Sequence, residues 1–219
     1  MSRSAAFFDM DHTLLLANSA PRYVRWRVSR GELPRSELAR SALWLAQYSL
    51  GLLDVNALAT KVSAPYRGTP EATLRSEIAA WTRAEVLPLL SSLARAALAS
   101  EQAQGRVCVL LTSATAYAAE PVAAAVGIPH VLCSSLEVDD GVFTGRAVFP
   151  LCYGEGKVTM AERWSAAHGV DLASSTFYTD SISDRPMLER VGHPRVVNPD
   201  ARLAFLALRR GWSVQRWSE

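Results

Sequence analysis

The chain has 219 residues, long enough for one substantial core or for a core domain with a small inserted one. Hydrophobic residues make up 49% and charged residues 20%, which is ordinary for a globular protein. With 23 basic and 21 acidic residues, the net charge is only +2. This balance gives no general attraction to nucleic acid, so we expect no nucleic-acid partner.

The cysteine content and the hydropathy pattern indicate where the protein works. Cys108, Cys133 and Cys152 are odd in number and form no Cys-x-x-Cys pair, which argues against a disulfide framework and against a zinc site. We therefore expect a reducing, cytoplasmic setting. The first predicted strand begins at residue 5, leaving no room for a signal peptide, and no apolar run approaches the roughly 20 residues of a membrane span. We expect no membrane partner; the sequence does not predict the oligomeric state.

The first predicted element is the apolar run Ala5–Phe8, which ends in two acids one residue apart, Asp9 and Asp11. Such a run predicts a strand buried on both faces. Ligands of an open parallel sheet bind beyond the carboxyl ends of its strands, so the two acids are expected at the mouth of a cleft. Taken alone, the Asp-x-Asp-x-Thr pattern that ends at Thr13 is more typical of a turn in which aspartates cap backbone amides.

The pattern is helical from residue 16 to residue 84, with no strand in between. Glycines and capping residues predict helices at 21–30, 36–48, 55–63 and 70–83, the first capped by Asn18 or Ser19. We interpret this stretch as a small helical bundle inserted after the first motif. Its basic side chains fit a solvated face. If the bundle closes over the cleft, Arg67, in the turn between Tyr66 and Gly68, is the first candidate to contact substrate.

From residue 85 onward, helical and strand-like segments alternate. The apolar strand Val107–Leu111 leads into Thr112 and Ser113, and a short strand is predicted at His130–Cys133. The Asp-Asp-Gly sequence at 139–141 lies between two short apolar runs and predicts an accessory hairpin beside the sheet. The alternation as a whole predicts right-handed βαβ units around a parallel sheet.

The last third of the chain contains three further polar positions at predicted element ends. Lys157 lies in a glycine-rich start of a helix that runs to residue 168, and the strand Phe177–Thr179 leads into Asp180. Asp184 begins a short helix. A final strand at 195–197 ends in the Asn-Pro-Asp sequence at 198–200, which is predicted to cap a last helix over 201–210.

These elements predict an α/β protein: a Rossmann-like parallel sheet with helices on both faces and an inserted helical-bundle cap. The predicted core domain is discontinuous and comprises residues 1–15 and 85–219, while residues 16–84 form the cap.

Taken in chain order, the polar residues at these element ends resemble the four motifs of the haloacid dehalogenase superfamily, specifically its phosphoserine-phosphatase-like branch (subfamily IB). The resemblance covers nearly the whole chain and rests on Asp9 with Asp11, Thr112 with Ser113, Lys157, and Asp180 with Asp184. It implies a phosphatase that hydrolyses a small phosphorylated metabolite. The reaction would pass through an aspartyl-phosphate, because a carboxylate at a strand end can attack phosphorus and split hydrolysis into two easier displacements.

The resemblance also implies a role for each position. Asp9 would be the nucleophile, and Asp11 would act as general acid and base. Mg²⁺ would be held by carboxylate oxygens of Asp9 and Asp180 and by the backbone carbonyl of Asp11, with Asp184 supporting its waters. Phosphate oxygens would be held by Thr112, Ser113 and Lys157.

One position departs from the pattern. Phosphoserine-specific members carry an acidic residue shortly after the first motif, where it binds the ammonium group of the substrate, and this chain has the neutral Asn18 there. The departure favours a phosphomonoester whose leaving group lacks a fixed cation. Two alternatives stay open: a phosphotransferase or phosphomutase of the same fold, and a non-catalytic binding module.

Overall fold

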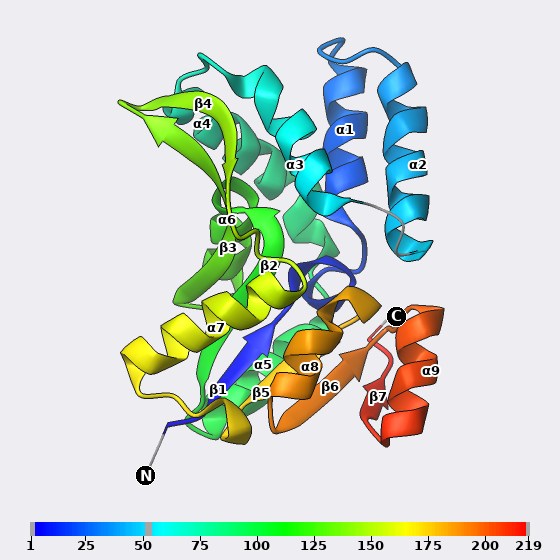
Figure 1. The fold of residues 1–219 in the computed structure, drawn as a ribbon, viewed down its shortest axis with the longest axis vertical. Helices are drawn as coiled ribbons and strands as arrows, with labels where there is room; N and C mark the ends of the chain where they lie inside the picture. Colours follow the sequence, from blue (N-terminus) through cyan, green and yellow to red (C-terminus); the bar gives the residue numbers. More distant parts are fainter. Residues whose placement is uncertain (1–2, 51–53, 218–219) are drawn as a thin grey trace.

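The computed structural model describes residues 3–50 and 54–217, and it has two lobes joined at a narrow waist (Figure 1). Within these residues the larger lobe holds a seven-stranded sheet with the strand order β4-β3-β2-β1-β5-β6-β7. The strands are β1 (Ala5–Phe8), β2 (Val107–Thr115), β3 (His130–Asp139), β4 (Val142–Val148), β5 (Thr176–Thr179), β6 (His193–Val197) and β7 (Ser213–Gln215).

The centre of the sheet is parallel. β1 pairs with β2 on one side and with β5 on the other, and only the edge pair β3–β4 is antiparallel. The parallel strands therefore end at one edge of the sheet, where the residues after β1, β2 and β5 come together. The predicted α/β class with a Rossmann-like sheet is confirmed.

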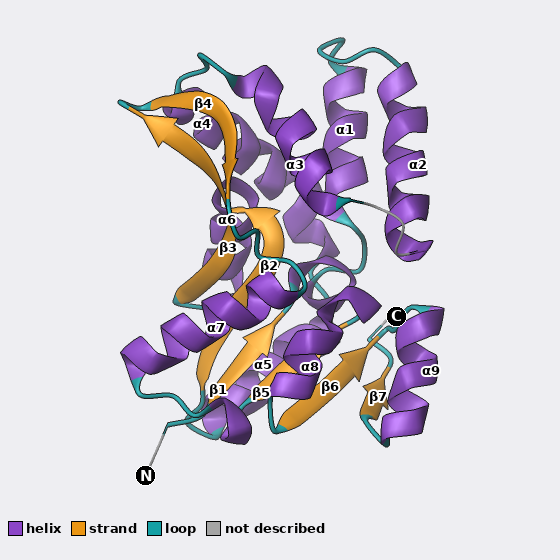
Figure 2. Ribbon diagram, viewed as in Figure 1, coloured by secondary structure: helices purple, strands orange, loops and turns teal. Residues whose placement is uncertain are grey.

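Helices cover both faces of the sheet (Figure 2). On one face, α5 and α6 pack on a core that includes Phe8 and Leu110, and on the other α7, α8 and α9 pack on a core that includes Phe7 and Phe177. Alternate residues of the central strands thus face different cores, which explains the continuous apolar runs in these strands. The helices of this lobe are α5 (Ser92–Ala103), α6 (Ala116–Val126), α7 (Glu155–His168), α8 (Arg185–Arg190) and α9 (Ala201–Arg210).

The smaller lobe contains the first four α-helices after β1 and lies over the carboxyl edge of the sheet (Figure 1). Its residues follow directly from the first turn after β1, so the chain enters this lobe beside Asp9 and Asp11. The division into a core of 1–15 and 85–219 and a cap of 16–84 stays a prediction. The helices are α1 (Ser19–Ser29), α2 (Ser36–Leu50), α3 (Val55–Ser63) and α4 (Glu71–Trp81).

The β3–β4 hairpin was expected beside the sheet, and this expectation is wrong. The predicted strand at His130–Cys133 continues through two serines to Asp139, so that β3 pairs first with β2 and then with β4. Ser134 is buried in this strand, and its hydroxyl accepts a hydrogen bond from Cys152 N (3.1 Å), so the polar side chain has a partner there.

The tip of the hairpin bonds to the smaller lobe. Gly68 N donates to Phe143 O (2.9 Å), Phe143 N donates to Thr69 O (3.0 Å), and Glu71 N donates to Gly141 O (2.8 Å). The hairpin therefore belongs to the core sheet at its base and contacts the helical lobe at its tip.

Among the residues that the structure describes, no helix is both long and apolar enough to cross a membrane.

Candidate active site

Asp9 lies at the carboxyl end of β1, on the waist between the lobes. Its backbone N–H donates to Tyr178 O (2.9 Å), which continues the β1–β5 pairing to the last residue before the turn. The chain then makes one wide helical turn, Met10–Leu14, closed by Leu15 N donating to Met10 O (2.9 Å). His12 occupies the left-handed region (φ 53°) within this turn, so the backbone reverses directly after the two acids.

Lys157 reaches the site from the first turn of α7. The loop before this helix passes so close to it that a Cβ on Gly156 would lie 1.8 Å from Leu151 O. Only glycine fits at this position, and this close approach lets the first turn of α7 pack against the loop. The Lys157 side chain is 3% exposed and its ammonium lies 5.6 Å from the centre of the Phe177 ring.

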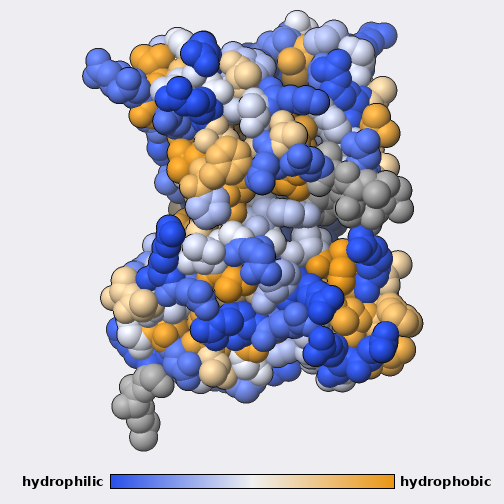
Figure 3. Space-filling model, viewed as in Figure 1, coloured by the Kyte–Doolittle hydropathy of each residue, from blue (hydrophilic) through white to orange (hydrophobic). Residues whose placement is uncertain are grey.

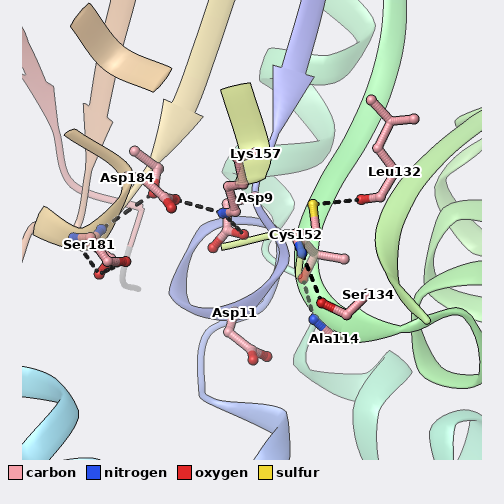
Figure 4. A network of polar contacts seen from close by, with 12 residues as sticks. Asp9, Asp11, Ala114, Leu132, Ser134, Cys152, Lys157, Ser181 and Asp184 are labelled. Carbon is pink, nitrogen blue, oxygen red and sulfur yellow. Dashed lines mark hydrogen bonds and ion pairs between the residues drawn. The ribbon is translucent and has the colours of Figure 1, made fainter. Parts of the chain in front are cut away.

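The Lys157 ammonium bridges two carboxylates from different strand ends (Figure 4). It donates to Asp9 Oδ1 and to Asp184 Oδ2, each at 2.7 Å. Thr179, the last residue of β5, donates its hydroxyl to the same Asp184 oxygen (2.6 Å). The structure therefore brings together three of the sequence-predicted residues, which are separated by up to 175 positions (9 to 184) in the chain.

Burial and neighbouring charges shift the pKa values of Asp9 and Lys157. The pKa of Asp9 is raised to about 7 by burial, against the lowering effect of Lys157 and with a further contribution from the nearby carboxylate of Asp184. Burial alone would lower the pKa of Lys157, but Asp184 and Asp9 outweigh it and raise the pKa above its ordinary value. Lys157 is thus held as a cation between acids, one of which resists ionisation.

Asp180 follows β5 and completes the acidic side of the site. Its pKa is raised by burial first, and then by the charges of Asp9 and Asp184. If Asp9, Asp180 and Asp184 are all ionised, their three negative charges exceed the single positive charge of Lys157 by two. This excess of negative oxygen donors suits a hard divalent cation such as Mg²⁺.

Side chains alone do not make a complete metal site. Among residues 3–50 and 54–217, no group of three His, Cys, Asp or Glu side chains is arranged to hold a metal ion. The predicted ligand set has two carboxylates, from Asp9 and Asp180, and takes its third oxygen from the backbone of Asp11. A set of this kind fits Mg²⁺, which keeps several waters and binds few protein groups.

Asp11 points away from Lys157 and toward the helical lobe (Figure 4). Its carboxylate accepts hydrogen bonds from Ser19 N (2.8 Å) and from the Ser19 hydroxyl (3.1 Å), at the start of α1. Burial raises the pKa of Asp11, and the bonds from Ser19 lower it in part. A raised pKa makes the carboxyl group a better proton donor than an ordinary aspartic acid, which suits a group that exchanges a proton with substrate or water.

The two substrate candidates have different surroundings. Asn18 caps α1, because its Oδ1 accepts a hydrogen bond from Ala20 N (3.0 Å). Arg67 is exposed and packs over β4, where a Cβ on Gly145 would lie 2.9 Å from Arg67 Cβ. Contact of either residue with substrate stays a prediction.

The sequence predicts a strand that ends at Leu111, ahead of Thr112 and Ser113, and this end is wrong because both residues lie inside β2. The strand continues to Thr115 and α6 begins at Ala116. Thr112 is buried, its hydroxyl accepts a hydrogen bond from Ala114 N (3.2 Å), and Ser113 is exposed. The pairing of β2 with β3 shifts register between Thr112 and Thr115, so this stretch is a local irregularity at the carboxyl edge.

Sequence reasoning missed four polar residues that support the site: Ser19, Thr179, Asn198 and Asp200. Thr179 could have been found, since it immediately precedes Asp180 and a hydroxyl at a buried strand end needs a partner. The Asn-Pro-Asp sequence was identified as a helix cap, and Asp200 does accept from Leu203 N (2.8 Å) at the start of α9. Its contacts with the site were not predictable from spacing.

Comparisons with known proteins show which family the chain belongs to. The family model of haloacid dehalogenase-like hydrolases matches residues 6–189. A probable phosphatase of Mycobacterium tuberculosis is 33% identical over 99% of this chain and 76% of its own length. A histidinol-phosphatase of Neisseria meningitidis is 29% identical over 97% of this chain and 98% of its own length.

A solved structure supports the same fold. The crystal structure of a phospho-aspartyl intermediate analogue of phosphoserine phosphatase aligns with a TM-score of 0.73 and 14% identity, covering 100% of this chain and 95% of that one. The chain belongs to the haloacid dehalogenase-like hydrolase family, and it is a hydrolase of the phosphatase type.

Proposed function

We propose that the protein is a Mg²⁺-dependent phosphomonoesterase that acts on a small phosphorylated metabolite through an aspartyl-phosphate on Asp9. The observation that carries the proposal is the Lys157 ammonium, held at 2.7 Å from both Asp9 and Asp184 in a buried site. A phosphate dianion approaching Asp9 meets a repulsive carboxylate, and Lys157, bound to Asp9 Oδ1, reduces this repulsion by offsetting the charge of the carboxylate. Asp9 Oδ2 receives no hydrogen bond from Lys157, which leaves it available for attack.

In the proposed reaction, Asp9 attacks phosphorus and the bond to the leaving alcohol breaks. Bound Mg²⁺, held by Asp9, Asp180 and the Asp11 carbonyl, would neutralise charge on the phosphoryl oxygens. Lys157, with Thr112 and Ser113 in the second half of β2, binds the same oxygens. Water then attacks phosphorus, and the bond to Asp9 Oδ2 breaks to release phosphate and restore the carboxylate.

Asp11 is the proposed general acid and base of both steps. It protonates the leaving alkoxide in the first step and deprotonates the attacking water in the second. Its raised pKa supports this role, because burial favours the protonated form that must donate to the leaving alkoxide. Its bonds to Ser19 orient the carboxyl group from the start of α1.

Replacing Asp11 with Asn tests this role. We expect Asp11→Asn to lower kcat by about 10²- to 10⁴-fold, the usual contribution of a general acid–base group. The amide oxygen can still accept from Ser19 N, so the α1 contact is retained and the melting temperature should change little. Rapid-quench kinetics should show slower formation and slower breakdown of the phosphoenzyme. A variant that forms phosphoenzyme at the wild-type rate would contradict the assignment.

The leaving group is proposed to be a small alcohol. Relatives named histidinol-phosphatase and phosphoserine phosphatase make histidinol phosphate and phosphoserine the first compounds to compare. Asn18 brings no charge to pair with an ammonium group, so we propose a substrate whose recognition does not depend on that pair. The cytoplasmic location also remains a proposal, supported by three free cysteines among the described residues.

A screen of phosphorylated metabolites with Mg²⁺ and with EDTA tests the function. The panel should include phosphoserine, histidinol phosphate, sugar phosphates and lipid-derived phosphates. We expect hydrolysis of at least one compound that is lost in EDTA and restored by Mg²⁺. Added alcohol acceptors separate a phosphatase from a phosphotransferase, because transfer would yield a new phosphoester in place of phosphate. Hydrolysis that is unaffected by EDTA, or no hydrolysis of any compound, would contradict the proposal.

A further inference from the structure

The Asn-Pro-Asp turn at 198–200, which joins β6 to α9, contacts the turn that carries Asp9 and Asp11. The side-chain amide of Asn198 donates from Nδ2 to His12 O (2.9 Å). His12 is the residue at which the backbone reverses, in the left-handed region. This bond therefore fixes the middle of the Met10–Leu14 turn from a strand two positions away in the sheet.

The same turn also contacts the loop that carries Asp180 and Asp184. Asp200 N donates to Asp180 O (2.9 Å), and Asp200 Oδ2 accepts from Ile182 N (2.8 Å). The backbone on both sides of Ser181 is thus held by one residue. Asp200 uses its other oxygen to cap α9, so the site loop and the helix share one anchor.

The C-terminal strand orients Asn198. The Asn198 backbone lies in the left-handed region (φ 44°), where asparagine is favoured over most residues. Its N–H donates to Gln215 O (3.0 Å), and its side-chain oxygen accepts from Trp217 N (2.7 Å). With the oxygen engaged by Trp217, the amide nitrogen is directed to His12 O.

We infer that Asn198 and Asp200 are positioning residues that hold the nucleophile turn and the acidic loop in register with each other. Neither is placed to touch substrate through the contacts described; each acts through a backbone group beside an acid of the site. Such supporting hydrogen bonds matter because a small displacement of the nucleophile or of a metal ligand lowers the catalytic rate. The inference rests on the proposed function, because that function makes the acids of both loops take part in the same reaction.

Asn198→Asp is the sharpest single test. It keeps the size of the side chain, its tolerance of the left-handed backbone and an oxygen for Trp217 N, but it removes the donor to His12 O. We expect kcat to fall about 10- to 100-fold with little change in KM, the usual effect of losing an outer partner of a site. Asn198→Gly removes the side chain without adding charge and should show a similar loss.

The matched control is Gln104→Glu, the same change from amide to acid on the exposed end of α5. It should leave kcat unchanged. Loss of kcat in Asn198→Asp but not in Asn198→Gly would assign the effect to added charge and overturn the inference.

Asp200→Ser separates capping from positioning. Serine retains an acceptor for Leu203 N, as N-cap residues do, and loses the second oxygen that binds Ile182 N. We expect kcat to fall while the melting temperature stays near that of the wild type. Because one turn holds both loops, the double variant Asn198→Gly/Asp200→Ser should lose less than the product of the two single losses. Fully multiplicative losses would mean that the two loops are held independently, which would overturn the shared role.

Amide hydrogen exchange gives a readout that does not depend on turnover. Protection of Leu15 N, which closes the Met10–Leu14 turn, should decrease in Asn198→Asp and stay unchanged in Gln104→Glu. Unchanged protection of Leu15 N together with unchanged kcat in Asn198→Asp would overturn the inference. If Asp9→Asn is inactive while Asn198→Asp is fully active, the inference fails and the proposed function stands. If no substrate is found, faster exchange at Leu15 still supports the positioning role and unchanged exchange refutes it.

Discussion

Asp9→Asn should lower kcat by at least about 10⁴-fold, because an amide cannot attack phosphorus and no covalent intermediate can form. Asparagine has nearly the same shape, and it removes a carboxyl group whose ionisation is opposed by burial and by Asp184. We therefore expect the melting temperature to stay within a few degrees of the wild type. Mg²⁺-dependent phosphate release and incorporation of labelled phosphate into the protein are the two measurements.

The control for this variant is Asp140→Asn, the same change at an exposed hairpin position in the left-handed region. It should keep wild-type kcat and KM. Phosphate release by purified Asp9→Asn at a comparable rate, after a contaminating phosphatase has been excluded, would refute nucleophilic attack by Asp9. A labelled protein that still forms in Asp9→Asn would place the covalent step on another residue.

Lys157→Met should combine a loss of activity with a loss of stability. Removing the ammonium leaves Asp9 and Asp184 buried without their shared partner, and breaking a buried ion pair in this way typically costs about 3–5 kcal/mol. The phosphoryl group also loses a cation, so kcat should fall by about 10²- to 10³-fold or more. Chemical denaturation and steady-state kinetics measure the two effects.

The loss of stability in Lys157→Met should depend on pH with a definite sign. The folded pKa of Asp9 is already about 7 with Lys157 present, above the ordinary value of 3.8, and it rises further without the ammonium. The folded state then binds a proton that the unfolded state releases, so stability rises as pH falls through the folded pKa. The free energy of unfolding that Lys157→Met loses relative to the wild type should be larger near pH 8 than near pH 5. A deficit that grows as pH falls would contradict this account.

Two variants complete the test of Lys157. Lys61→Met changes the other lysine of the chain, which is exposed in α3, and should leave activity and stability unchanged. In the Asp9→Asn background, Lys157→Met should cost less stability than in the wild type, because one of the two carboxylates is gone. Equal costs in both backgrounds would show that Lys157 does not interact energetically with Asp9.

The central strands and the members of the ion-pair network could be predicted from the sequence. Strands β1, β2 and β5 contain apolar residues that are buried on both faces of the sheet, and this leaves a clear signal in runs such as Ala5–Phe8. The chain order of the motifs then brings Asp9, Lys157 and Asp184 to one edge. Their meeting is a consequence of parallel topology, in which strands far apart in sequence end at the same side of the sheet.

Other parts could not be predicted for physical reasons. β7 is only three residues long, Ser213–Gln215, and its polar residues carry no hydrophobic period. The continuation of β3 through Ser134 depends on a change of pairing partner, from β2 to β4, that local sequence does not encode. The contact of Asn198 with His12 joins positions 186 residues apart through one side-chain amide, and only coordinates reveal such a bond.

The bonds between the hairpin tip and the smaller lobe bear on how substrate enters. Figure 3 shows the molecule narrowing between the lobes. A rigid swing of the helices about their two chain connections would break the three backbone hydrogen bonds that link residues 68–71 to residues 141–143. Flexing of the β3–β4 ribbon would keep them. We therefore expect the two lobes to move apart by bending of the β3–β4 ribbon. The bending stiffness of this ribbon, rather than that of the two connecting segments, would then limit the separation of the lobes.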